Sequence, residues 1–410
     1  MAGSSERLRQ ATQQLGGPHS IAASLVEQPL ADPFCLRLNW SFVRRCYNPA
    51  NMKAVILAGG LGTRLRPLTL DTPKPIVPIF DRPFLCHQID VIRQVPEIDE
   101  VILSLSYQPD RIEAKIGNGE EVGIPVRYMV EPDPLGTGGA IKFACAGIDE
   151  TILVFNGDVL TGIDLQSVVE QHHKRQARAT IVLTPVSDPG AYGLVETDEQ
   201  GNVRSFIEKP NPDQISCDTI NAGIYVLEPE TFGRIPDGVA WSIERQYFPT
   251  FIERSETFIG YIDPGYWLDI GTIDSYVQAH RDLMAQRCPG GPFSGLDPDQ
   301  VYRSDGCVAQ DGAELVGPCF LGSGSVIESG ARVGPRSVIG SGCRVTSGAI
   351  VADTIVWRNT TIAAQAVVRN AVIGEACTIE HHVEICPGTV LGNRSVVTSY
   401  SRTRTPRGDK

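Results

Sequence analysis

Short apolar runs rich in β-branched residues alternate with helical segments between residues 52 and 286. The first run, at residues 53–58, is followed at once by glycines, which is typical of a buried strand in a parallel sheet. Leu85, Ile89 and Ile92 then recur at helical spacing. The pattern predicts further strands at 100–104, 126–130, 151–155, 191–195, 203–207 and 224–227, and helices at 136–146 and 272–286. This alternation indicates a mainly parallel α/β sheet with helices on both faces and ligands at the carboxyl ends of its strands.

After a turn-rich linker at residues 287–300, the pattern changes to one apolar residue in every six. The repeated positions form two series, which are Leu315, Leu321, Ile327, Val333, Ile339, Val345 and Val351, and then Ile355, Thr361, Val367, Ile373, Ile379, Ile385, Leu391 and Val397. The two series are only four residues apart where they meet, so one irregular corner is expected there. A six-residue apolar period is typical of a parallel β-helix built from hexapeptides. We expect five coils within residues 301–401, followed by a polar, disordered tail at 402–410.

The chain is therefore expected to contain two folded domains. One is the α/β domain at residues 52–286, and the other is a β-helix at residues 301–401, of the left-handed kind that hexapeptide repeats form. A rod of this kind exposes flat faces and coil ends, so we expect a homo-oligomer that assembles through the β-helix domain.

Residues 1–51 show no clear periodicity and no apolar stretch before a small-residue cleavage site, so they do not indicate a signal peptide. Met52 stands directly before the first predicted strand. We therefore expect this extension to lie outside the fold, with Met52 as the natural start. An organelle transit peptide is the alternative, which the acidic residues Glu6, Glu27 and Asp32 disfavour.

The candidate chemistry begins directly after the first strand. Three glycines in four positions, Gly59, Gly60 and Gly62, give a backbone that bends sharply and presents N–H groups to an anion. Thr63 adds a hydroxyl, and Arg64 adds a fork of donors suited to phosphate oxygens. A strand followed by such a loop predicts a phosphate-binding site.

Lys74 stands between two prolines, whose stiff and extended backbone aims its ammonium group. Two better-known glycine loops do not fit this stretch. Leu65 occupies the place of the third glycine in a dinucleotide-binding fingerprint, and no lysine follows the glycines directly, as a P-loop requires. Two cations beside a glycine-rich turn suit a triphosphate.

Asp158 follows the fourth predicted strand, directly after Gly157. A carboxylate at the carboxyl end of a strand is well placed for Mg²⁺, which binds one or two protein carboxylates together with phosphate oxygens. Mn²⁺ is the expected substitute. The alternative is an aspartate that caps the next turn.

The string G-G-x-G-T-R-L-x-P-L-T from Gly59, followed by P-K-P around Lys74, resembles the signature of sugar-1-phosphate nucleotidyltransferases, also called nucleotide-sugar pyrophosphorylases. The resemblance runs from residue 52 to about residue 284 and implies a Rossmann-like nucleotidyltransferase domain. It also implies the reaction, in which a nucleoside triphosphate transfers its nucleotidyl group to a sugar 1-phosphate and pyrophosphate leaves. No protein nucleophile is needed for this chemistry.

The same resemblance implies roles for particular residues. Arg64, Lys74 and Asp158 are the implied catalytic residues, and Asp269, 111 positions after Asp158 (269 − 158), is the implied second metal ligand. The implied nucleotide-binding residues are Leu57, Gly59, Gly60, Gly62, Thr63, Glu131, Gly136 and Thr137, and the implied sugar-phosphate-binding residues are Gly193, Glu208, Lys209 and Asn221. Residues 131–139 form a second glycine loop, which includes Gly136 and Thr137. Taken singly, this second glycine loop and the sugar-binding residues would be interpreted as surface turns.

A transferase followed by hexapeptides resembles mannose-1-phosphate guanylyltransferases and some glucose-1-phosphate uridylyl-, thymidylyl- and adenylyltransferases. The strings L-G-T-G-G and N-A-G-I-Y are most similar to the mannose type, so GTP and mannose 1-phosphate are the expected substrates. Glu131 is then expected to read guanine, whose two adjacent donors suit a carboxylate. The glucose-type alternatives stay open.

Two other classes of function were weighed. Acyl transfer is one, because hexapeptide helices also host acetyltransferases and the pair His381 and His382 lies in a repeat. A non-catalytic sensor of nucleotide sugars is the other, and the presence of the implied catalytic residues disfavours it.

Composition narrows the partners further. The formal net charge is −12, which disfavours a nucleic acid or an anionic membrane surface as partner of the whole chain. No run approaches 18 consecutive apolar residues, so no membrane span is expected. Eleven scattered cysteines without a C-x-x-C motif indicate reduced thiols and a cytoplasmic protein.

Overall fold

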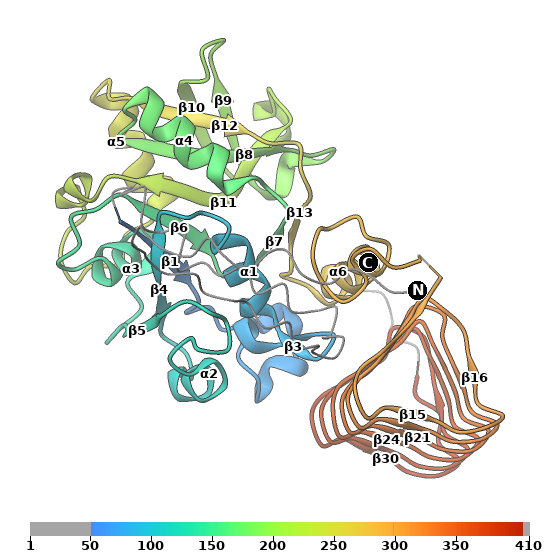
Figure 1. Cartoon of the computed structure of the whole chain (residues 1–410). Coiled ribbons are helices and arrows are strands. Elements are labelled where there is room, and N and C mark those ends of the chain that lie inside the picture. The colour runs from blue at the N-terminus through green and yellow to red at the C-terminus, as the bar shows by residue number, and fades with distance from the viewer. Residues whose placement is uncertain (1–50, 298, 405–410) are drawn as a thin grey trace, which may run out of the picture. The chain divides into compact units, whose positions relative to one another are not determined.

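The computed structural model describes residues 51–297 and 299–404, so the expectations for residues 1–50 and 405–410 lie outside the described residues. Residues 52–284 contain a nine-stranded sheet in the order β10-β9-β11-β6-β1-β4-β5, with β8 paired to β11 and β12 paired to β8 (Figure 1). The strands are β1 (Met52–Leu57), β4 (Ile98–Leu105), β5 (Val126–Val130), β6 (Ile152–Asn156), β8 (Ala179–Pro185), β9 (Gly193–Thr197), β10 (Val203–Glu208), β11 (Thr219–Leu227) and β12 (Phe258–Ile262). The helices are α1 (Phe84–Ile92), α2 (Pro109–Ile116), α3 (Gly136–Ala144), α4 (Leu165–Arg175), α5 (Phe248–Glu253) and α6 (Ile273–Met284).

The sheet is parallel in one half and antiparallel in the other. β1 pairs in parallel with β4 and β6, and β4 pairs in parallel with β5. β11 runs antiparallel to β6, β8 and β9, and β9 runs antiparallel to β10. The parallel half carries the glycine-rich loop, and the antiparallel half carries the residues predicted to bind the sugar phosphate.

Successive residues of β1 face opposite sides of the sheet. Ala54 and Ile56 lie in an apolar cluster with α1, α2 and α4, whereas Val55 lies in a second cluster with α3 and α5. All three side chains are fully buried. A strand covered on both faces is apolar on both sides, which explains why residues 54–58 form a continuous apolar run. The α/β fold class predicted from the sequence is confirmed.

The predicted elements and the observed ones differ where the apolar pattern is weak. β5 has its predicted bounds, whereas β11 begins five residues before the predicted residue 224 and continues through an irregularity between Asn221 and Tyr225. Helix α2 was not predicted, because only Ile112 and Ile116 of its eight residues are buried.

Residues 301–397 form a β-helix of three parallel sheets, whose strands repeat from coil to coil (Figure 1). The first sheet contains β14 (Val301–Arg303), β17 (Cys319–Leu321), β20 (Ser337–Ile339), β23 (Ile355–Val356), β26 (Val372–Ile373) and β29 (Val390–Leu391). The second contains β15 (Val308–Ala309), β18 (Val326–Ile327), β21 (Arg344–Val345), β24 (Thr361–Ile362), β27 (Thr378–Ile379) and β30 (Val396–Val397). The third contains β16 (Glu314–Leu315), β19 (Arg332–Val333), β22 (Ile350–Ala352), β25 (Val367–Arg369) and β28 (Glu384–Ile385).

The predicted phase of the apolar repeat is wrong in one coil. The residues that enter the interior there are Val356, Ile362 and Val368, not their predicted neighbours Ile355, Thr361 and Val367. The chain makes two steps of five residues, from Val351 to Val356 and from Val368 to Ile373, in place of one step of four. Asp353 and Asn370 have positive φ angles of 52° and 46° at these two corners, and such residues tolerate the left-handed conformation of a tight corner.

The β-helix begins at the predicted residue 301 and ends later than predicted. Together, the three sheets give five complete coils and two strands of a sixth within the described residues. The first coil escaped the periodicity because Arg303 and Ala309 occupy its repeat positions. At the other end, Arg402 bridges to Glu384 and the Thr403 N–H donates to the Glu384 carbonyl at 3.0 Å, so these two residues of the predicted tail continue the coil.

The α/β domain at residues 52–286 and the β-helix share an apolar core. Phe80 and Tyr276 from the first domain pack in one buried cluster with Phe320, Val338 and Trp357 from the β-helix. Phe80 and Phe320 have ring centroids 5.1 Å apart. The two domains therefore depend on each other to bury aromatic surface.

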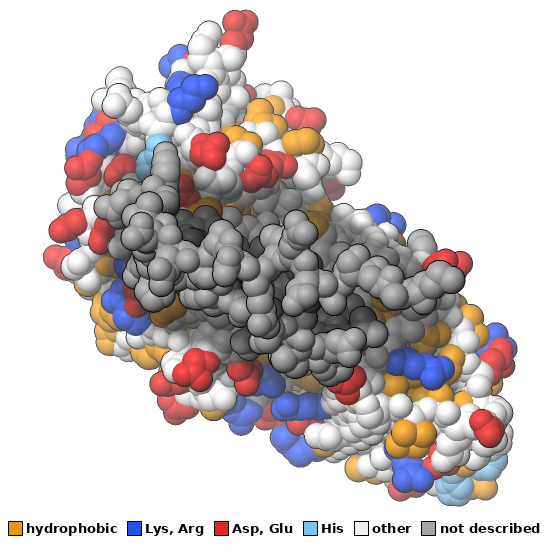
Figure 2. Space-filling view, viewed as in Figure 1, with side chains coloured by type: hydrophobic (Ala, Val, Ile, Leu, Met, Phe, Trp, Pro, Cys, Tyr) orange, Lys and Arg blue, Asp and Glu red, His pale blue; other side chains and the backbone are white. Residues whose placement is uncertain are grey.

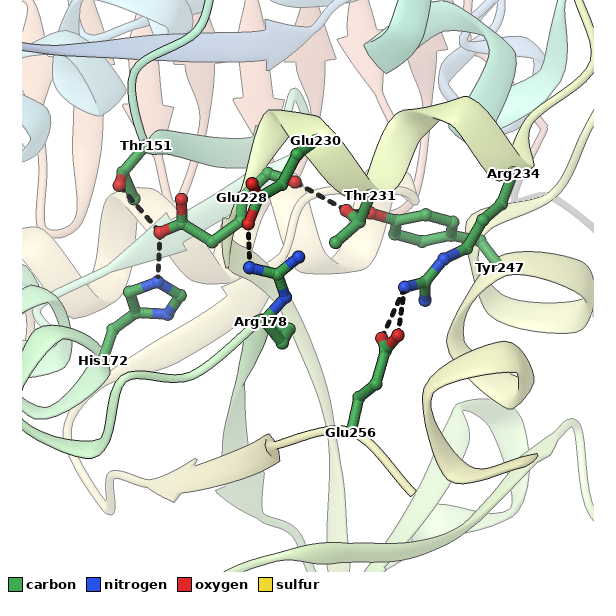
Figure 3. Close-up of polar contacts among 9 residues, drawn as sticks. All are labelled: Thr151, His172, Arg178, Glu228, Glu230, Thr231, Arg234, Tyr247 and Glu256. Carbon is green, nitrogen blue, oxygen red and sulfur yellow. Dashed lines mark hydrogen bonds and ion pairs between the residues drawn. The ribbon is translucent and has the colours of Figure 1, made fainter. Parts of the chain in front are cut away.

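A chain of polar contacts closes the end of the sheet that lies away from the glycine-rich loop (Figure 3). Buried His172 engages Thr180 through Nδ1 at 2.8 Å and Glu228 through Nε2 at 2.9 Å. Burial raises the pKa of Glu228, but the hydrogen bonds from His172 and Thr151 outweigh it and leave this pKa below its usual value. Arg234 pairs with Glu256 and stacks over an aromatic ring, so the network satisfies its own charges and serves stability.

The surface and the thiols carry further information on the described residues. Acidic and basic side chains are interspersed on the face shown in Figure 2. In the described ranges, no helix combines the length and the apolar character that a membrane span requires. All nine cysteines within the described residues are free thiols.

The first prediction concerns acid stability. Burial lowers the pKa of His87 and of His280 to about 4, below the value of 6.5 in an unfolded chain. His280 Nε2 accepts the Phe80 N–H at 3.1 Å and its Nδ1 lies 3.0 Å from the Tyr276 carbonyl, so the neutral ring satisfies both contacts. As pH falls, the unfolded chain binds protons first. Stability is therefore full above pH 6.5 and is lost between pH 6.5 and about 4, at up to about 1.4 kcal/mol per pH unit for each histidine.

Urea unfolding of the wild type, His280→Gln and His173→Gln at several pH values measures this loss. The wild type and the control at exposed His173 should show the same pH dependence, and His280→Gln should show a shallower one. Equal slopes for all three proteins would contradict the assignment.

The second prediction concerns the shared core. A fragment of residues 52–286 lacks the β-helix and exposes the aromatic cluster around Phe80 and Tyr276. We expect this fragment to aggregate or to change its association state, whereas a chain that ends at residue 404 should behave as the intact protein does. Sedimentation velocity measures both. A soluble fragment with the association state of the intact protein would show that the β-helix is not the assembly device.

Candidate active site

The glycine-rich loop leaves the carboxyl end of β1 and turns back against the segment that carries Lys74. Gly62 has a φ of 59°, and a Cβ placed on it would lie 2.9 Å from the Lys74 Cβ. Thr69 donates its hydroxyl to the Gly62 carbonyl at 2.7 Å. Position 62 therefore requires glycine both for its backbone conformation and for its close approach to Lys74.

A cavity of about 440 Å³ lies at this edge of the sheet and collects the residues predicted to bind the nucleotide and to catalyse the reaction. Eleven predicted residues line it, namely Leu57, Gly59, Gly60, Gly62, Thr63, Arg64, Lys74, Glu131, Gly136, Thr137 and Asp158. They come from the ends of β1, β5 and β6 and from the start of α3, as expected for the carboxyl edge of a parallel sheet.

Asp158 projects from the sharp turn between β6 and β7 (Val159–Thr161). The Lys74 ammonium donates to Asp158 Oδ2 at 2.9 Å, and the lysine side chain is only 10% exposed. Gln88 on α1 donates to the carbonyls of Asn156 and Val159, both at 2.9 Å, and so holds both ends of the turn. A Cβ on Gly157 would lie 2.3 Å from the Leu57 carbonyl oxygen, so the turn packs directly against β1.

Asp269 reaches the same place through a short antiparallel ribbon. It lies in β13 (Trp267–Asp269) and pairs with Val159 of β7, and the next residue, Ile270, donates its N–H to the Asp158 carbonyl at 2.8 Å. Arg64 Nη2 lies 4.0 Å from Asp269 Oδ2. Two carboxylates from distant parts of the chain thus meet beside two cations.

The charges at this meeting point favour a cation. Burial and the nearby charge of Asp158 raise the pKa of Asp269, and Lys74 and Arg64 only partly offset them. Asp269 Oδ1 is buried and has no hydrogen-bond partner among the described residues. A buried carboxylate oxygen without a donor fits a metal ligand, and two carboxylates suffice for Mg²⁺ when phosphate oxygens complete its shell. The described ranges contain no cluster of three or more metal-ligating side chains.

The second glycine loop is held by a distant segment. The Trp241 backbone carbonyl accepts the Gly138 N–H at 2.8 Å, and the Thr137 hydroxyl donates to Glu244 Oε2 at 2.9 Å. Glu131 accepts the Leu135 N–H at 2.9 Å and the Ser104 hydroxyl at 3.1 Å. The Glu131 carboxylate therefore both lines the cavity and caps its own loop.

The predicted sugar-phosphate residues do not line this cavity, and two of them, Gly193 and Asn221, adjoin residues that contact Trp267, two positions before Asp269. Trp267 donates its indole N–H to the Ala222 carbonyl at 2.8 Å, and its ring lies edge to face with Tyr192 at 5.4 Å. Gly193 begins β9 next to Tyr192, and Asn221 precedes Ala222. The sugar-phosphate region and the nucleotide cavity thus meet at β13.

The side chains of this second region are engaged locally. Glu208 lies over Gly193, because a Cβ there would be 2.8 Å from Glu208 Oε2. Burial and the charge of Glu244 raise the pKa of Glu208. Asn221 donates to the Tyr225 hydroxyl and accepts the Gly223 N–H, both at 2.9 Å, so its amide holds the irregular part of β11.

Several residues of the site escaped sequence reasoning. Ser106, just beyond β4, donates to the Gly59 carbonyl at 2.8 Å. Gly271, two residues after β13, packs against Arg64, because a Cβ on it would lie 2.5 Å from Arg64 Nη2. Ser106 carried a signal, since it is a polar residue after an apolar strand. Gln88 carried a weaker one, as a polar residue among apolar neighbours in a predicted helix. Gly271 carried none.

The chain is similar to known proteins over both of its domains. Residues 53–286 match the family model described as nucleotidyl transferase, and residues 298–402 match that of the EIF2B subunit epsilon LbH domain. A mannose-1-phosphate guanylyltransferase of Mycobacterium tuberculosis is 41% identical over 279 residues, which cover 68% of this chain and 77% of the relative. A UTP–glucose-1-phosphate uridylyltransferase of Synechocystis is 30% identical, over 80% of this chain and 88% of the relative. The crystal structure of HddC from Yersinia pseudotuberculosis superimposes with a TM-score of 0.50 at 33% identity, over 56% of this chain and 99% of that chain.

The parallel sheet, the glycine-rich loop and the paired carboxylates define an enzyme that handles phosphates at the carboxyl edge of its sheet. The chain belongs to the nucleotidyl transferase family and is a nucleotidyltransferase. Its resemblance to sugar-1-phosphate nucleotidyltransferases with a C-terminal left-handed β-helix is thereby confirmed.

The third prediction tests Asp158. Asp158→Asn keeps the size of the side chain but removes the charge that pairs with Lys74, so turnover should fall by roughly 100- to 1000-fold. Pyrophosphate release measures turnover, and circular dichroism checks the fold. Asp149→Asn, at an exposed carboxylate, is the control and should match the wild type. A folded Asp158→Asn enzyme with wild-type turnover would contradict the role given to Asp158.

Proposed function

We propose that this protein transfers a guanylyl group from GTP to mannose 1-phosphate and releases pyrophosphate. The observation that carries the transferase part is the single cavity that collects the glycine-rich loop, Lys74 and Asp158 beside Asp269. The mannose type is supported by the relative named mannose-1-phosphate guanylyltransferase at 41% identity, compared with 30% for the uridylyltransferase.

In the proposed reaction, a phosphate oxygen of the sugar 1-phosphate attacks the α-phosphorus of the triphosphate. The bond from the α-phosphorus to the bridging oxygen breaks, and pyrophosphate leaves with that bonding pair. Lys74 and Arg64 offset the negative charge that grows on the leaving group, and Lys209 holds the attacking phosphate. The protein contributes position and charge, so no covalent intermediate is required.

Mg²⁺, with Mn²⁺ as a substitute, is the proposed cofactor, and Asp158 and Asp269 are its proposed protein ligands. The buried Asp269 Oδ1, which lacks a donor in the described part of the chain, supports this assignment. When bound, the metal would neutralise charge on the phosphates. Removal of divalent ions should therefore abolish turnover.

Glu131 is the proposed reader of guanine. Its carboxylate lines the cavity at the end of β5. One oxygen accepts the Leu135 N–H of the loop and the other accepts the Ser104 hydroxyl of β4, so each retains a lone pair for another donor. Guanine presents two adjacent donors, whereas uracil and thymine present one donor between two carbonyls. A carboxylate meets the guanine edge better for this reason.

A glucose-type uridylyl-, thymidylyl- or adenylyltransferase is the second candidate. It is favoured by the contacts of Glu131 with the Leu135 N–H of the loop and the Ser104 hydroxyl of β4, since a residue with a purely structural role would read no base. Acyl transfer has weaker support, because His381 and His382 are exposed at a corner of the last coils, where His381 lies edge to face with Tyr400 and His382 stacks on it.

A substrate matrix tests the proposal. GTP, UTP, dTTP and ATP are each paired with mannose 1-phosphate and glucose 1-phosphate, and pyrophosphate release is scored. GTP with mannose 1-phosphate should give the highest kcat/KM. A preference for UTP or dTTP would support the glucose-type alternative.

The fourth prediction concerns Glu131. Glutamine can still accept the Leu135 N–H and can donate to the Ser104 hydroxyl, so Glu131→Gln should keep the loop but lose one acceptor for guanine. The preference for GTP over UTP and dTTP should fall about tenfold or more, equivalent to about 1.4 kcal/mol. Asp133→Asn, in the same loop but exposed, is the matched control. An unchanged ratio of kcat/KM values in Glu131→Gln would exclude Glu131 as the base reader.

A further inference from the structure

We propose that the β-helix positions the catalytic cation Lys74, and that Asn393 is the residue through which it does so. The proposal rests on the function given above to Lys74. It goes beyond that function by assigning a catalytic contribution to a domain that contributes no residue to the cavity.

The segment that carries Lys74 is tied to the β-helix on both sides of the lysine. On the N-terminal side, Asn393 Nδ2 donates to Thr72 Oγ1 at 3.1 Å. On the C-terminal side, Ser341 donates its N–H and its hydroxyl to the Asp81 carboxylate at 2.9 and 2.7 Å. Lys74 thus lies within a stretch of ten residues whose two ends are held by different coils.

A third tie lies between these two. The Trp357 indole N–H donates to the Tyr276 hydroxyl at 2.9 Å, and that hydroxyl donates to the Pro78 carbonyl at 2.5 Å. Trp357 and Tyr276 are both buried. The C-terminal side is therefore held at Pro78 and at Asp81 by contacts that do not involve Asn393.

On the N-terminal side, Thr72 and Asp71 are tied to the β-helix by the side chains of Asn393 and Arg394. A cavity of about 410 Å³ lies between the segment and the β-helix, and Thr72, Pro78, Trp357 and Asn393 are among its lining residues. With open space beside it, Thr72 is held by its bond to Asn393. The Arg394–Asp71 ion pair beside it is too exposed to replace that bond, since its arginine is 67% exposed.

Asn393 is itself rigidly placed. Its Oδ1 accepts the Glu375 N–H at 2.9 Å, from the corner of the preceding coil. A Cβ on Gly374 would lie 2.7 Å from this oxygen, so the amide fits closely against the coil beneath it. One half of the amide is fixed by the β-helix and the other half holds Thr72.

Thr72 transmits this position to the site. Only Pro73, with its restricted φ, separates Thr72 from Lys74, so a shift of Thr72 moves the lysine backbone. The Lys74 side chain is nearly buried and reaches Asp158 at 2.9 Å, which leaves little slack to absorb such a shift. Asn393 is therefore a positioning residue that acts through Lys74.

The fifth prediction follows from this chain of contacts. Asn393→Ala and Thr72→Val, both made in the full-length protein, each remove the tie, and kcat should fall about tenfold, equivalent to about 1.4 kcal/mol. KM for the triphosphate should change much less, because Lys74 acts on charge that develops in the transition state. Thr72→Ser keeps the hydroxyl and should retain wild-type kcat. Ser323→Ala is the control, at an exposed corner of another coil.

A double-mutant cycle with Lys74→Ala separates positioning from a merely structural role. If Asn393 acts through Lys74, Asn393→Ala should slow the wild type but should not slow Lys74→Ala further. An equal slowing in both backgrounds would overturn the proposal, as would wild-type kcat in Asn393→Ala and Thr72→Val. If Lys74→Ala itself retained full activity, the proposed function of Lys74 would fail instead. Thermal unfolding of each variant verifies that the fold is intact.

Discussion

Two carboxylates with like charge face one partly buried space, and the arrangement of the site follows from the need to balance them. Asp158 and Asp269 meet because β7 and β13 pair. Burial and the nearby charge of Asp158 raise the pKa of Asp269. Lys74 and Arg64 supply the opposite charge within the protein. This balance of charges suits the divalent cation proposed above and the phosphates that such a cation binds.

The same constraint explains why rigid support surrounds the site. Charges balance only when they are held at fixed distances. Arg64, Lys74 and Asp158 lie in short turns between longer elements, and Asp269 ends the short strand β13. Gln88 closes the turn that carries Asp158, and Gly62 allows the glycine-rich loop to pack against Lys74. The β-helix extends this support, since its coils hold both ends of the segment that contains Lys74.

The two halves of the sheet carry the residues proposed to bind the two substrates. The parallel half ends in loops that place backbone N–H groups and cations around the nucleotide cavity. The antiparallel half carries Glu208, Lys209 and Asn221, and β13 lies where the two halves meet. This division suits an enzyme that must bring two phosphorylated substrates together with their reacting atoms in line.

The local pattern of the sequence was sufficient for much of this. Strong apolar runs and a glycine-rich string predicted β1, its loop and the presence of a phosphate site, because burial on both faces and close backbone approach restrict which residues occur there. The hexapeptide period predicted the β-helix, because one side chain in every six must be apolar to fill the interior of each coil. It misplaced Val356, Ile362 and Val368 by one residue, because a corner one residue shorter leaves no mark in an apolar pattern that allows Ile355 and Val356 alike.

Only the tertiary structure could decide which distant residues meet. Asp158 and Asp269 are brought together by a β-ribbon, and Thr72 meets Asn393 across 321 positions. Such pairs depend on sheet order and on the packing of one domain against another, which local periodicity does not encode. The family resemblance pointed to Asp269, but nothing in the residues around Asn393 distinguished it from other coil corners. Asn393 differs from the residues at other corners because the folded β-helix places its amide against Thr72, two residues before Lys74.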